Sequence, residues 1–530
     1  MKKIALISAS ALALSISGAA LAQQAPVTAT PLSPGVADCT TTGTGDCSDV
    51  EQTGTGETAS VSQSGTGTSV SDIDQTGTGN TATVTQTSTA GNANESLITQ
   101  GSAAVNAEAS VSQTGEGNLS LVNQAGDDIT ATVVQDGSGN SSEVDQRVFS
   151  DFSSVAVSQF GDANASEITQ TDDGASVNVT QSNFLPGSTG NSSVVTQTGE
   201  GANVSVIQTG QENASEVGQS ANNANVFVTQ SGTQNESFVD QAGAFTNVSV
   251  TQTGNRNRSE VDQAGLGATI NVDQNGNDNR SIVEQTALGA LVDVDQVGDD
   301  NLSTLDQLNG GALARVDQTG NDNEAIIRER AEASSATITQ TGDGNYGAIG
   351  QADAFQFTFG GNIEFDSASI TQEGNGNQGT IRQYGRFQQA SITQIGNNNT
   401  AGDSAGAVGI RQVGIGQVAN VLQQGDGNNS VVQQGTGSTF FVGSGSSMDN
   451  VADVNQSGDN GVSTIMQDGN NNTALLEQLA GGEGNESVIM QGGFDNFASV
   501  RQGGVADFSS VDQNGTGNSA VVAQNVPVSP

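Results

Sequence analysis

The chain has 530 residues, of which 70 are glycine and 4% aromatic, and it contains no histidine and no tryptophan. Its formal net charge of −44 repels phosphate backbones and anionic lipid surfaces, so nucleic acid and acidic membranes are not expected partners. With 33% hydrophobic residues the chain cannot fill several ordinary globular cores, so any core has to be thin and repetitive.

Residues 1–22 are predicted to be a signal peptide. Lys2 and Lys3 provide a positive start, an apolar run begins at Ile4, and Ala20-Leu21-Ala22 has the small-x-small pattern of a cleavage site. No later stretch approaches the ~18 continuous apolar residues of a transmembrane helix. We therefore expect an exported chain whose mature part has no transmembrane span.

Residues 23–50 form a Thr-, Gly- and Pro-rich leader that could serve as a targeting segment. It holds both cysteines of the chain, Cys39 and Cys47. Export permits a disulfide between them that would close a small loop. Two cysteines are too few for a four-ligand zinc site.

Residues 51–530 are predicted to be one repeat array. Its clearest mark is a glutamine at every eleventh position, at Gln197, Gln208, Gln219, Gln230, Gln241, Gln252, Gln263, Gln274, Gln285, Gln296, Gln307 and Gln318. Glu329 replaces the next member, and the phase then resumes at Gln340. Shorter in-phase blocks before and after are separated by expected insertions around 182–190, 355–365 and 439–448.

Each unit alternates with a period of two residues, as a strand with one inner and one outer face does. In "NRSEVDQ", Asn257, Ser259, Val261 and Gln263 share one parity, which we assign to the interior with the valine. Helix is disfavoured because Gly, Asn, Ser, Thr and Val dominate and a glycine-containing turn interrupts each run.

The asparagines show that the structural period is 22 residues, because Asn235, Asn257 and Asn279 follow only every second glutamine by five positions. We therefore expect an all-β fold, a β-solenoid of stacked strand-turn-strand repeats of ~22 residues with cross-β, amyloid-like spacing of about 4.8 Å between layers. Buried amides are normally unfavourable, but in such a stack each side-chain N–H can donate to the identical residue in the adjacent layer.

The pattern Gln-x-Gly-x-x-Asn-x-Ser-x-x-x-Gln, read at Gln252, Gly254, Asn257, Ser259 and Gln263, resembles the curlin repeat of bacterial curli fibre subunits. The resemblance implies a subunit secreted through an outer-membrane curli-type pore of a Gram-negative bacterium. It also implies homopolymerisation outside the cell into a fibre for adhesion and biofilm matrix, with an accessory or nucleator subunit as partner. Whether this chain would be the major subunit or the nucleator stays open.

By this resemblance and the stacking argument, a set of Gln, Asn and Ser residues should form structural ladders. They are Gln230, Asn235, Gln241, Gln252, Asn257, Ser259, Gln263, Gln274, Asn279, Ser281, Gln285, Gln296, Asn301, Gln307, Gln318 and Asn323.

Enzymatic activity is not expected, because without histidine neither a Ser-His-Asp triad nor a Cys-His pair can form. The most site-like departure from the repeat is "FQFTFGGNIEFD", with Phe355, Phe357, Phe359, Glu364 and Asp366, which we interpret as a loop covering a break in the array. Two alternatives to a fibre subunit remain: a secreted or cell-surface β-solenoid adhesin that does not polymerise, and a polysaccharide-active β-helix enzyme.

No cofactor is expected, although weak surface binding of divalent cations such as calcium is compatible with the acidic surface. The turns "GNDN" (276–279) and "GDGN" (342–345) lack the nine-residue period of calcium-binding repeats, so we interpret them as plain turns. Carboxylates also precede the glutamines on the outer face, where their stacking should raise their pKa values through mutual repulsion. These positions read Asp240, Asp262, Glu284 and Asp306 in one column and Asp273, Asp295 and Asp317 in the other.

Overall fold

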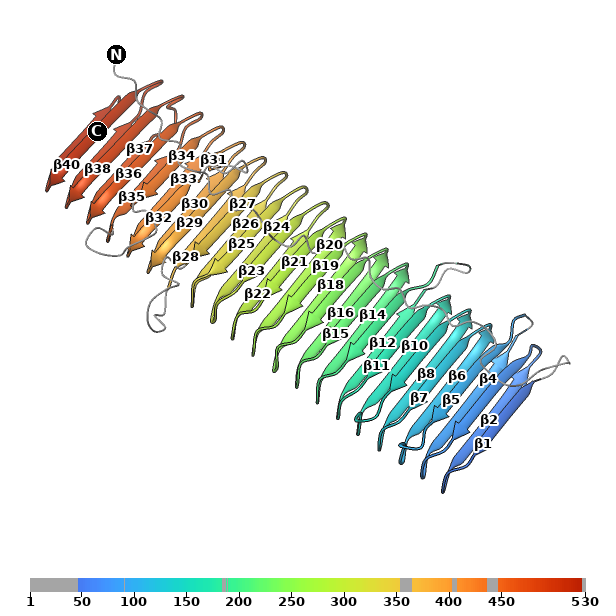
Figure 1. The fold of residues 1–530 in the computed structure, drawn as a ribbon. Coiled ribbons are helices and arrows are strands. Elements are labelled where there is room, and N and C mark those ends of the chain that lie inside the picture. Colours follow the sequence, from blue (N-terminus) through green and yellow to red (C-terminus); the bar gives the residue numbers. More distant parts are fainter. Residues whose placement is uncertain are drawn as a thin grey trace, which may run out of the picture. The chain divides into compact units, whose positions relative to one another are not determined.

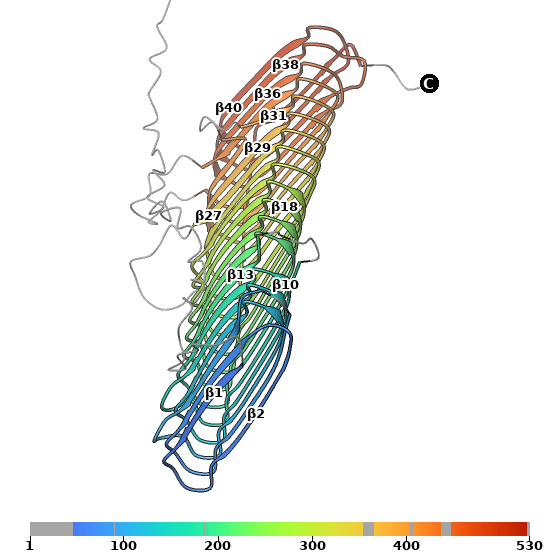
Figure 2. The same ribbon diagram turned by 90° about the vertical axis from the view of Figure 1, so that its right-hand side faces the viewer.

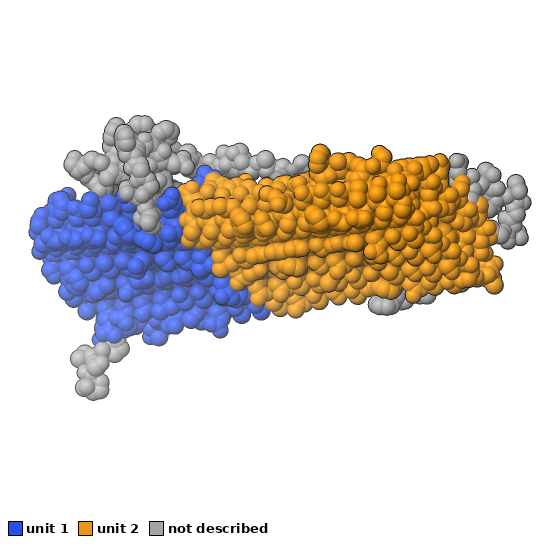
Figure 3. All heavy atoms as spheres, turned by 90° about the horizontal axis from the view of Figure 1, so that it is seen from below, with its two compact units in different colours: residues 1–25, 313–530 blue, residues 26–312 orange. Residues whose placement is uncertain are grey.

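The structure, a computed structural model, describes residues 46–89, 91–183, 187, 189–352, 365–402, 408–435 and 447–526. All regular elements in these ranges are β-strands (Figure 1), and none of their segments is a helix able to cross a bilayer. Residues 1–22 and Cys39 lie outside the described ranges. The chain divides into two compact units, Pro26–Ala312 and Leu313–Pro530 with Met1–Ala25 (Figure 3).

The first unit is a coil with two walls of parallel strands, which we name the β1 wall and the β2 wall after their first members (Figure 2). The β1 wall contains β1 (Cys47–Gln52), β3 (Ser69–Gln75), β5 (Asn94–Gln100), β7 (Leu119–Gln124), β9 (Ser141–Gln146), β11 (Ala165–Gln170), β13 (Ser192–Gln197), β15 (Ala214–Gln219), β17 (Glu236–Gln241), β19 (Arg258–Gln263), β21 (Arg280–Gln285) and β23 (Leu302–Gln307). The β2 wall contains β2 (Thr58–Gly65), β4 (Thr81–Ser88), β6 (Glu108–Glu116), β8 (Thr130–Ser138), β10 (Ser154–Asp162), β12 (Ser176–Ser182), β14 (Asn203–Gln211), β16 (Asn225–Thr233), β18 (Asn247–Asn255), β20 (Thr269–Asn277) and β22 (Leu291–Val297).

The second unit is built in the same way, with a β24 wall and a β25 wall. The β24 wall contains β24 (Leu313–Thr319), β26 (Ser335–Thr341), β28 (Ser367–Glu373), β30 (Gln389–Ile395), β33 (Val418–Gln424), β35 (Val451–Gln456), β37 (Thr473–Gln478), β39 (Phe497–Gln502) and β41 (Ser519–Gln524). The β25 wall contains β25 (Glu324–Arg330), β27 (Tyr346–Ala352), β29 (Gln378–Arg386), β31 (Thr400–Ala401), β32 (Ile410–Ile415), β34 (Asn429–Gln434), β36 (Val462–Asn470), β38 (Glu486–Phe494) and β40 (Phe508–Thr516).

Strand pairing follows the 22-residue period. β18 pairs with β20 in parallel, with Gln252 opposite Gln274, an offset of 22 residues. At the expected insertion 182–190 the offset grows to 27, since Gln181 pairs with Gln208, and the glutamine register is kept. The strand register is therefore intact across this insertion.

The interior is as thin as the composition requires. In β18, Val248, Val250 and Gln252 are fully buried and alternate with exposed or half-buried residues. The buried apolar residues are mainly Val, Ile and Ala, the small and β-branched types that fit between two closely spaced walls. The predicted all-β solenoid of ~22-residue repeats, with its inner and outer faces, is confirmed.

Glycine is required in the turns between the walls because neighbouring layers approach closely there. Gly254 has a φ of 113°, and a Cβ at this position would lie 1.9 Å from the carbonyl oxygen of Gly276 in the next layer. Two residues further on, Arg256 also has a left-handed φ, of 56°. The turn thus delivers Asn257 to the interior at the start of β19.

Candidate functional site: amide ladders inside the solenoid

A glutamine ladder runs through the β2 wall. The Nε2 of Gln230 donates to Oε1 of Gln252 (2.8 Å), Gln252 donates to Gln274 (2.9 Å), and Gln274 donates to Gln296 (2.9 Å). All four side chains are fully buried. In the second unit, Gln318 likewise donates to Gln340 (2.9 Å).

The second N–H of each glutamine joins the two walls. Gln252 Nε2 also donates to the backbone carbonyl of Glu236 on β17 (2.9 Å), and Gln274 Nε2 donates to that of Arg258 on β19 (3.1 Å). Each amide therefore uses one donor along the stack and the other across it, so both donors of a buried group are satisfied.

The ladder of the β1 wall is interrupted where the sequence predicts continuity. Gln219 donates to Gln241 (2.8 Å), but in the described part of the chain no group donates to the buried Oε1 atoms of Gln263 and Gln285. The Nε2 of Gln285 lies 3.5 Å from Oε1 of Gln307. Gln263 instead donates to the carbonyl of Gly265 (3.0 Å), two residues further along the chain. The turn after Gln263 thus supplies a nearer acceptor than the next layer does.

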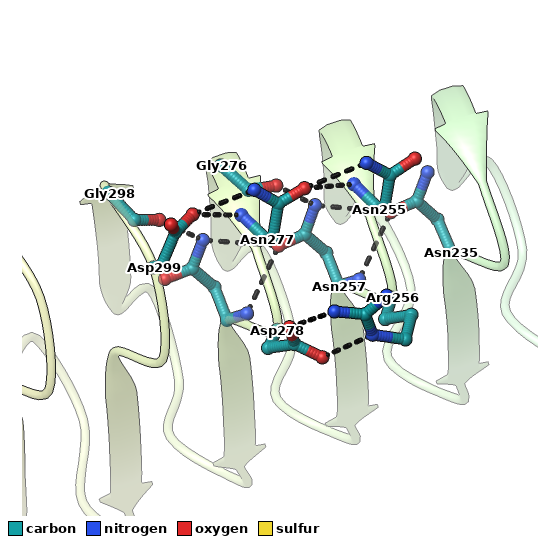
Figure 4. Close-up of polar contacts among 10 residues, drawn as sticks. Asn235, Asn255, Arg256, Asn257, Gly276, Asn277, Asp278, Gly298 and Asp299 are labelled. Carbon is teal, nitrogen blue, oxygen red and sulfur yellow. Dashed lines mark hydrogen bonds and ion pairs between the residues drawn. The ribbon is translucent and has the colours of Figure 1, made fainter.

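An asparagine ladder lines the turn that leads from the β2 wall to the β1 wall (Figure 4). Asn257 uses its backbone N and its Nδ2 to contact Oδ1 of Asn235, both at 3.1 Å, and Nδ2 also donates to the carbonyl of Gly276 (2.7 Å). Asn301 contacts Asn279 in the same way at 3.0 Å. In the second unit, Asn345 makes the corresponding contacts to Asn323.

The two ladders point in opposite directions. Glutamine amides donate toward the C-terminal layer, whereas asparagine amides donate toward the N-terminal layer. The C-terminal layer of such a stack therefore offers glutamine donors and asparagine acceptors, and the N-terminal layer offers the reverse.

The serines expected to be ladder residues do not form one. Ser259 and Ser281 are fully buried on the inner face and stand opposite each other, but neither Oγ has a hydrogen-bond partner within the described residues. The interval between layers does not itself prevent such a bond, since the Oγ of Ser509 donates to the Oγ of the opposed Ser487 (2.9 Å). These serines act as small interior residues beside the valines.

The second unit contains an asparagine column that the expected residues did not include. Asn472 contacts Oδ1 of Asn450 through its backbone N (2.9 Å), and Asn496 and Asn518 continue the column. It lies on the turns from the β25 wall to the β24 wall, whereas Asn345 lies on the opposite turns. The signal was present, since Asn472, Asn496 and Asn518 also follow a glutamine by five positions, but the insertions hide the change of side.

Charged residues gather on the outer surface of the β1 wall around β19. Arg258 pairs with Glu236 (2.5 Å) and with Glu260 (2.6 Å), and it stacks over the Phe238 ring at 4.8 Å from the centroid. Arg280 lies 3.6 Å from Glu260. Because Glu260 is itself nearly buried, this cluster neutralises a carboxylate between layers.

The carboxylates before the glutamines behave only partly as expected. Burial, and secondarily the charge of Asp240, raises the pKa of Asp262. Burial, and secondarily Asp293, raises the pKa of Asp273. The direction agrees with the sequence argument, but the assumption that repulsion within the column is the leading cause is wrong, because removal from solvent contributes more.

The remaining candidate residues, from the 355–366 segment and the N-terminal leader, do not form a site within the described residues. Asp366 is buried and its Oδ1 accepts from the backbone N of Gln388 (2.8 Å), while Phe355, Phe357, Phe359 and Glu364 lie outside the described residues. No three acidic or other metal-ligating side chains cluster within the described ranges. Cys47 is disulfide-bonded at the start of β1.

In the turn "GNDN", Asp278 forms an ion pair with Arg256 (2.5 Å, Figure 4). In "GDGN", Oδ1 of Asp343 accepts from the backbone N of Asn321 (2.8 Å). Both acids thus have contacts within the turns of the stack.

Each unit is a β-solenoid, because its strands pair in parallel and in register, each layer spans about 22 residues, and amide ladders run through the interior. The chain carries curlin associated repeats: the model of that repeat matches residues 106–137, 366–396, 374–402 and 448–479. The resemblance seen in the sequence is thereby confirmed. No curated protein matches the chain.

Proposed function

We propose that the protein is an exported, non-enzymatic structural subunit of extracellular curli-like amyloid fibres that serve adhesion and the biofilm matrix. The observation that supports this proposal most directly is the in-register glutamine ladder of the β2 wall, in which Gln230, Gln252 and Gln274 each donate to the identical residue of the next layer. A second copy can continue that pattern without any new surface being built.

The polarity of the ladders supports head-to-tail addition. At the first layer, Gln52 and Gln63 donate to Gln75 and Gln86, which leaves their Oε1 acceptors directed away from the stack. At the last layer, Gln513 accepts from Gln491 (2.9 Å), so its amide is directed toward an added layer. An incoming N-terminal layer therefore complements a C-terminal layer, since amide donors meet acceptors.

The curlin repeats and the predicted signal peptide support export through an outer-membrane curli-type pore, with an accessory or nucleator subunit starting growth. The acidic surface is compatible with weak binding of calcium between layers but with no dedicated cofactor.

The test is assembly of the purified mature chain after removal of denaturant. Electron microscopy should show fibres, and fibre diffraction should give reflections near ~4.7 and ~10 Å. Replacing Gln513 and Gln524 by leucine should slow growth on seeds made of the variant, because their C-terminal layer offers no amide donors. The unchanged N-terminal layer of the variant should still add to the C-terminal layer of parent seeds. A folded chain that stays monomeric by light scattering would favour the non-polymerising adhesin instead.

A further inference from the structure

Glu329 occupies a ladder position where neighbouring layers carry glutamine. It stands directly opposite Gln351 in the pairing of β25 with β27, and its side chain is fully buried on the inner face. A carboxyl group thus replaces a carboxamide of nearly the same shape in this ladder.

The next residue in the ladder lacks a donor. Gln351 Nε2 donates to Gln383 (2.8 Å) and to the carbonyl of Ser335 (3.2 Å), but its buried Oε1 has no hydrogen-bond partner among the residues that the structure describes. In the facing ladder of the same unit, the corresponding Oε1 of Gln372 accepts from Gln340 (2.9 Å). The group at position 329 is therefore the one that has to donate to Gln351.

A carboxylate has no proton to donate, whereas a carboxylic acid has one O–H. The neutral acid would place this O–H where the missing amide N–H belongs, and it would continue the ladder in the same direction. The ionised form would instead bring a negative charge against the lone pairs of a buried carbonyl oxygen, which is strongly unfavourable away from water.

The groups facing Glu329 within its unit are uncharged. The inward residues of the adjacent strands are Gly347, Ile349 and Gln351 on β27, Ala336, Ile338 and Gln340 on β26, and Ala314, Val316 and Gln318 on β24. On its own strand, Arg328 and Arg330 alternate to the outer face. The buried Asp366, just before β28, accepts from the backbone N of Gln388 one layer further on.

Glu260 shows how this protein accommodates a charged carboxylate that is almost buried. It contacts Arg258 at 2.6 Å and has Arg280 at 3.6 Å. The described inward residues of β24, β26 and β27 around Glu329 are amides, aliphatic residues and one glycine.

We propose that Glu329 is a buried proton-binding site, at which folding of the second unit takes up one proton so that the neutral carboxyl group donates to Gln351. An exposed glutamate in an unfolded chain titrates near 4.3, so at pH 7 only about one unfolded chain in 500 carries this proton. The ratio of folded to unfolded chains then falls up to tenfold for each pH unit above that value. Acid therefore promotes folding of this unit, and, where the proposed function holds, fibre assembly.

The test compares Glu329→Gln with Glu332→Gln in the full mature chain. Both remove one acid, but residue 332 is exposed and lies three positions away. Proton uptake on folding at pH 7, measured in weak buffer, should be one proton per chain smaller in E329Q than in the parent, and unchanged in E332Q. Infrared spectra of the folded parent and of E332Q should show the carbonyl band of a protonated carboxyl group, and E329Q should lose it.

A second variant makes the outcome independent of how well E329Q folds. Adding Gln340→Glu to E329Q installs an acid in the facing ladder and should restore both the band and the uptake. Equal proton uptake in parent and E329Q, or an unchanged band, overturns the proposal. Both readouts apply to the folded chain whether or not it forms fibres, so failure of assembly would contradict the proposed function and leave this result intact.

Discussion

The ladder makes an unusual prediction about paired substitutions in the β2 wall. Replacing Gln252 with leucine leaves two buried groups without partners, an N–H of Gln230 and the Oε1 of Gln274. Each such group costs about 1–3 kcal/mol, so the single change should destabilise the stack by about 2–6 kcal/mol before the burial of leucine offsets part of it. When the adjacent Gln230 is also replaced by leucine, the N–H without an acceptor is that of Gln208 instead of that of Gln230, and the number of unsatisfied groups stays at two.

The control is a double substitution of the same composition that skips a layer. With Gln208 and Gln252 both changed to leucine, unsatisfied groups arise on Gln181, twice on Gln230, and on Gln274. Leucine burial is the same in both doubles, so they should differ by two unsatisfied groups, about 2–6 kcal/mol.

The assay is guanidinium denaturation of the assembled mature chain, followed by circular dichroism. The adjacent double should have a midpoint close to that of the single variant, and the skipped double should have a clearly lower one. Equal midpoints for the two doubles would mean that the glutamines contribute independently, and the ladder account would be wrong.

The turns, the outer acids and the charge cluster give further predictions. Gly254→Ala should destabilise the stack much more than Gly267→Ala, because both have positive φ but only the first places its Cβ against a carbonyl oxygen, at 1.9 Å; thermal denaturation of the two variants tests this. Burial raises the pKa of Asp262, so its charge opposes folding at neutral pH and this cost is relieved as pH falls. Asp262→Asn should therefore raise the denaturation midpoint at pH 7 but not near pH 4. A gain in the midpoint that is the same at both pH values would contradict this reasoning. Arg258→Ala should cost about 3–5 kcal/mol because Glu260 keeps a nearly buried charge, and adding Glu260→Gln should recover most of the loss in denaturant titration.

The repeat pattern is what makes this fold readable from sequence. The asparagine spacing predicted the 22-residue layer, and the parity of Val261 and Gln263 predicted the inner face. Like residues stack on like in a parallel register, so each repeat carries the information for its own neighbours. This is why insertions such as 182–190 change the turns without displacing the strands.

The same pattern could not reveal how individual groups use the stack. Ser259 recurs as regularly as Asn257, yet within the described residues only the asparagine side chain of the two bonds to the adjacent layer. Gln263 has the same spacing as Gln252, but its amide donates to the carbonyl of Gly265 in the following turn. Periodicity records which residues share a column, whereas reach and competing acceptors depend on atomic positions.

By itself the sequence determined the strand type, the layer period and the identity of the buried columns, because alternation and exact recurrence are properties of the chain. Only the tertiary structure decided the opposite polarity of the Gln252 and Asn257 ladders, the leading role of burial at Asp262 and the missing donor at Gln351. The physical reason is that hydrogen bonds are directional and desolvation depends on the neighbours packed around a group, and neither quantity is contained in the spacing of residue types.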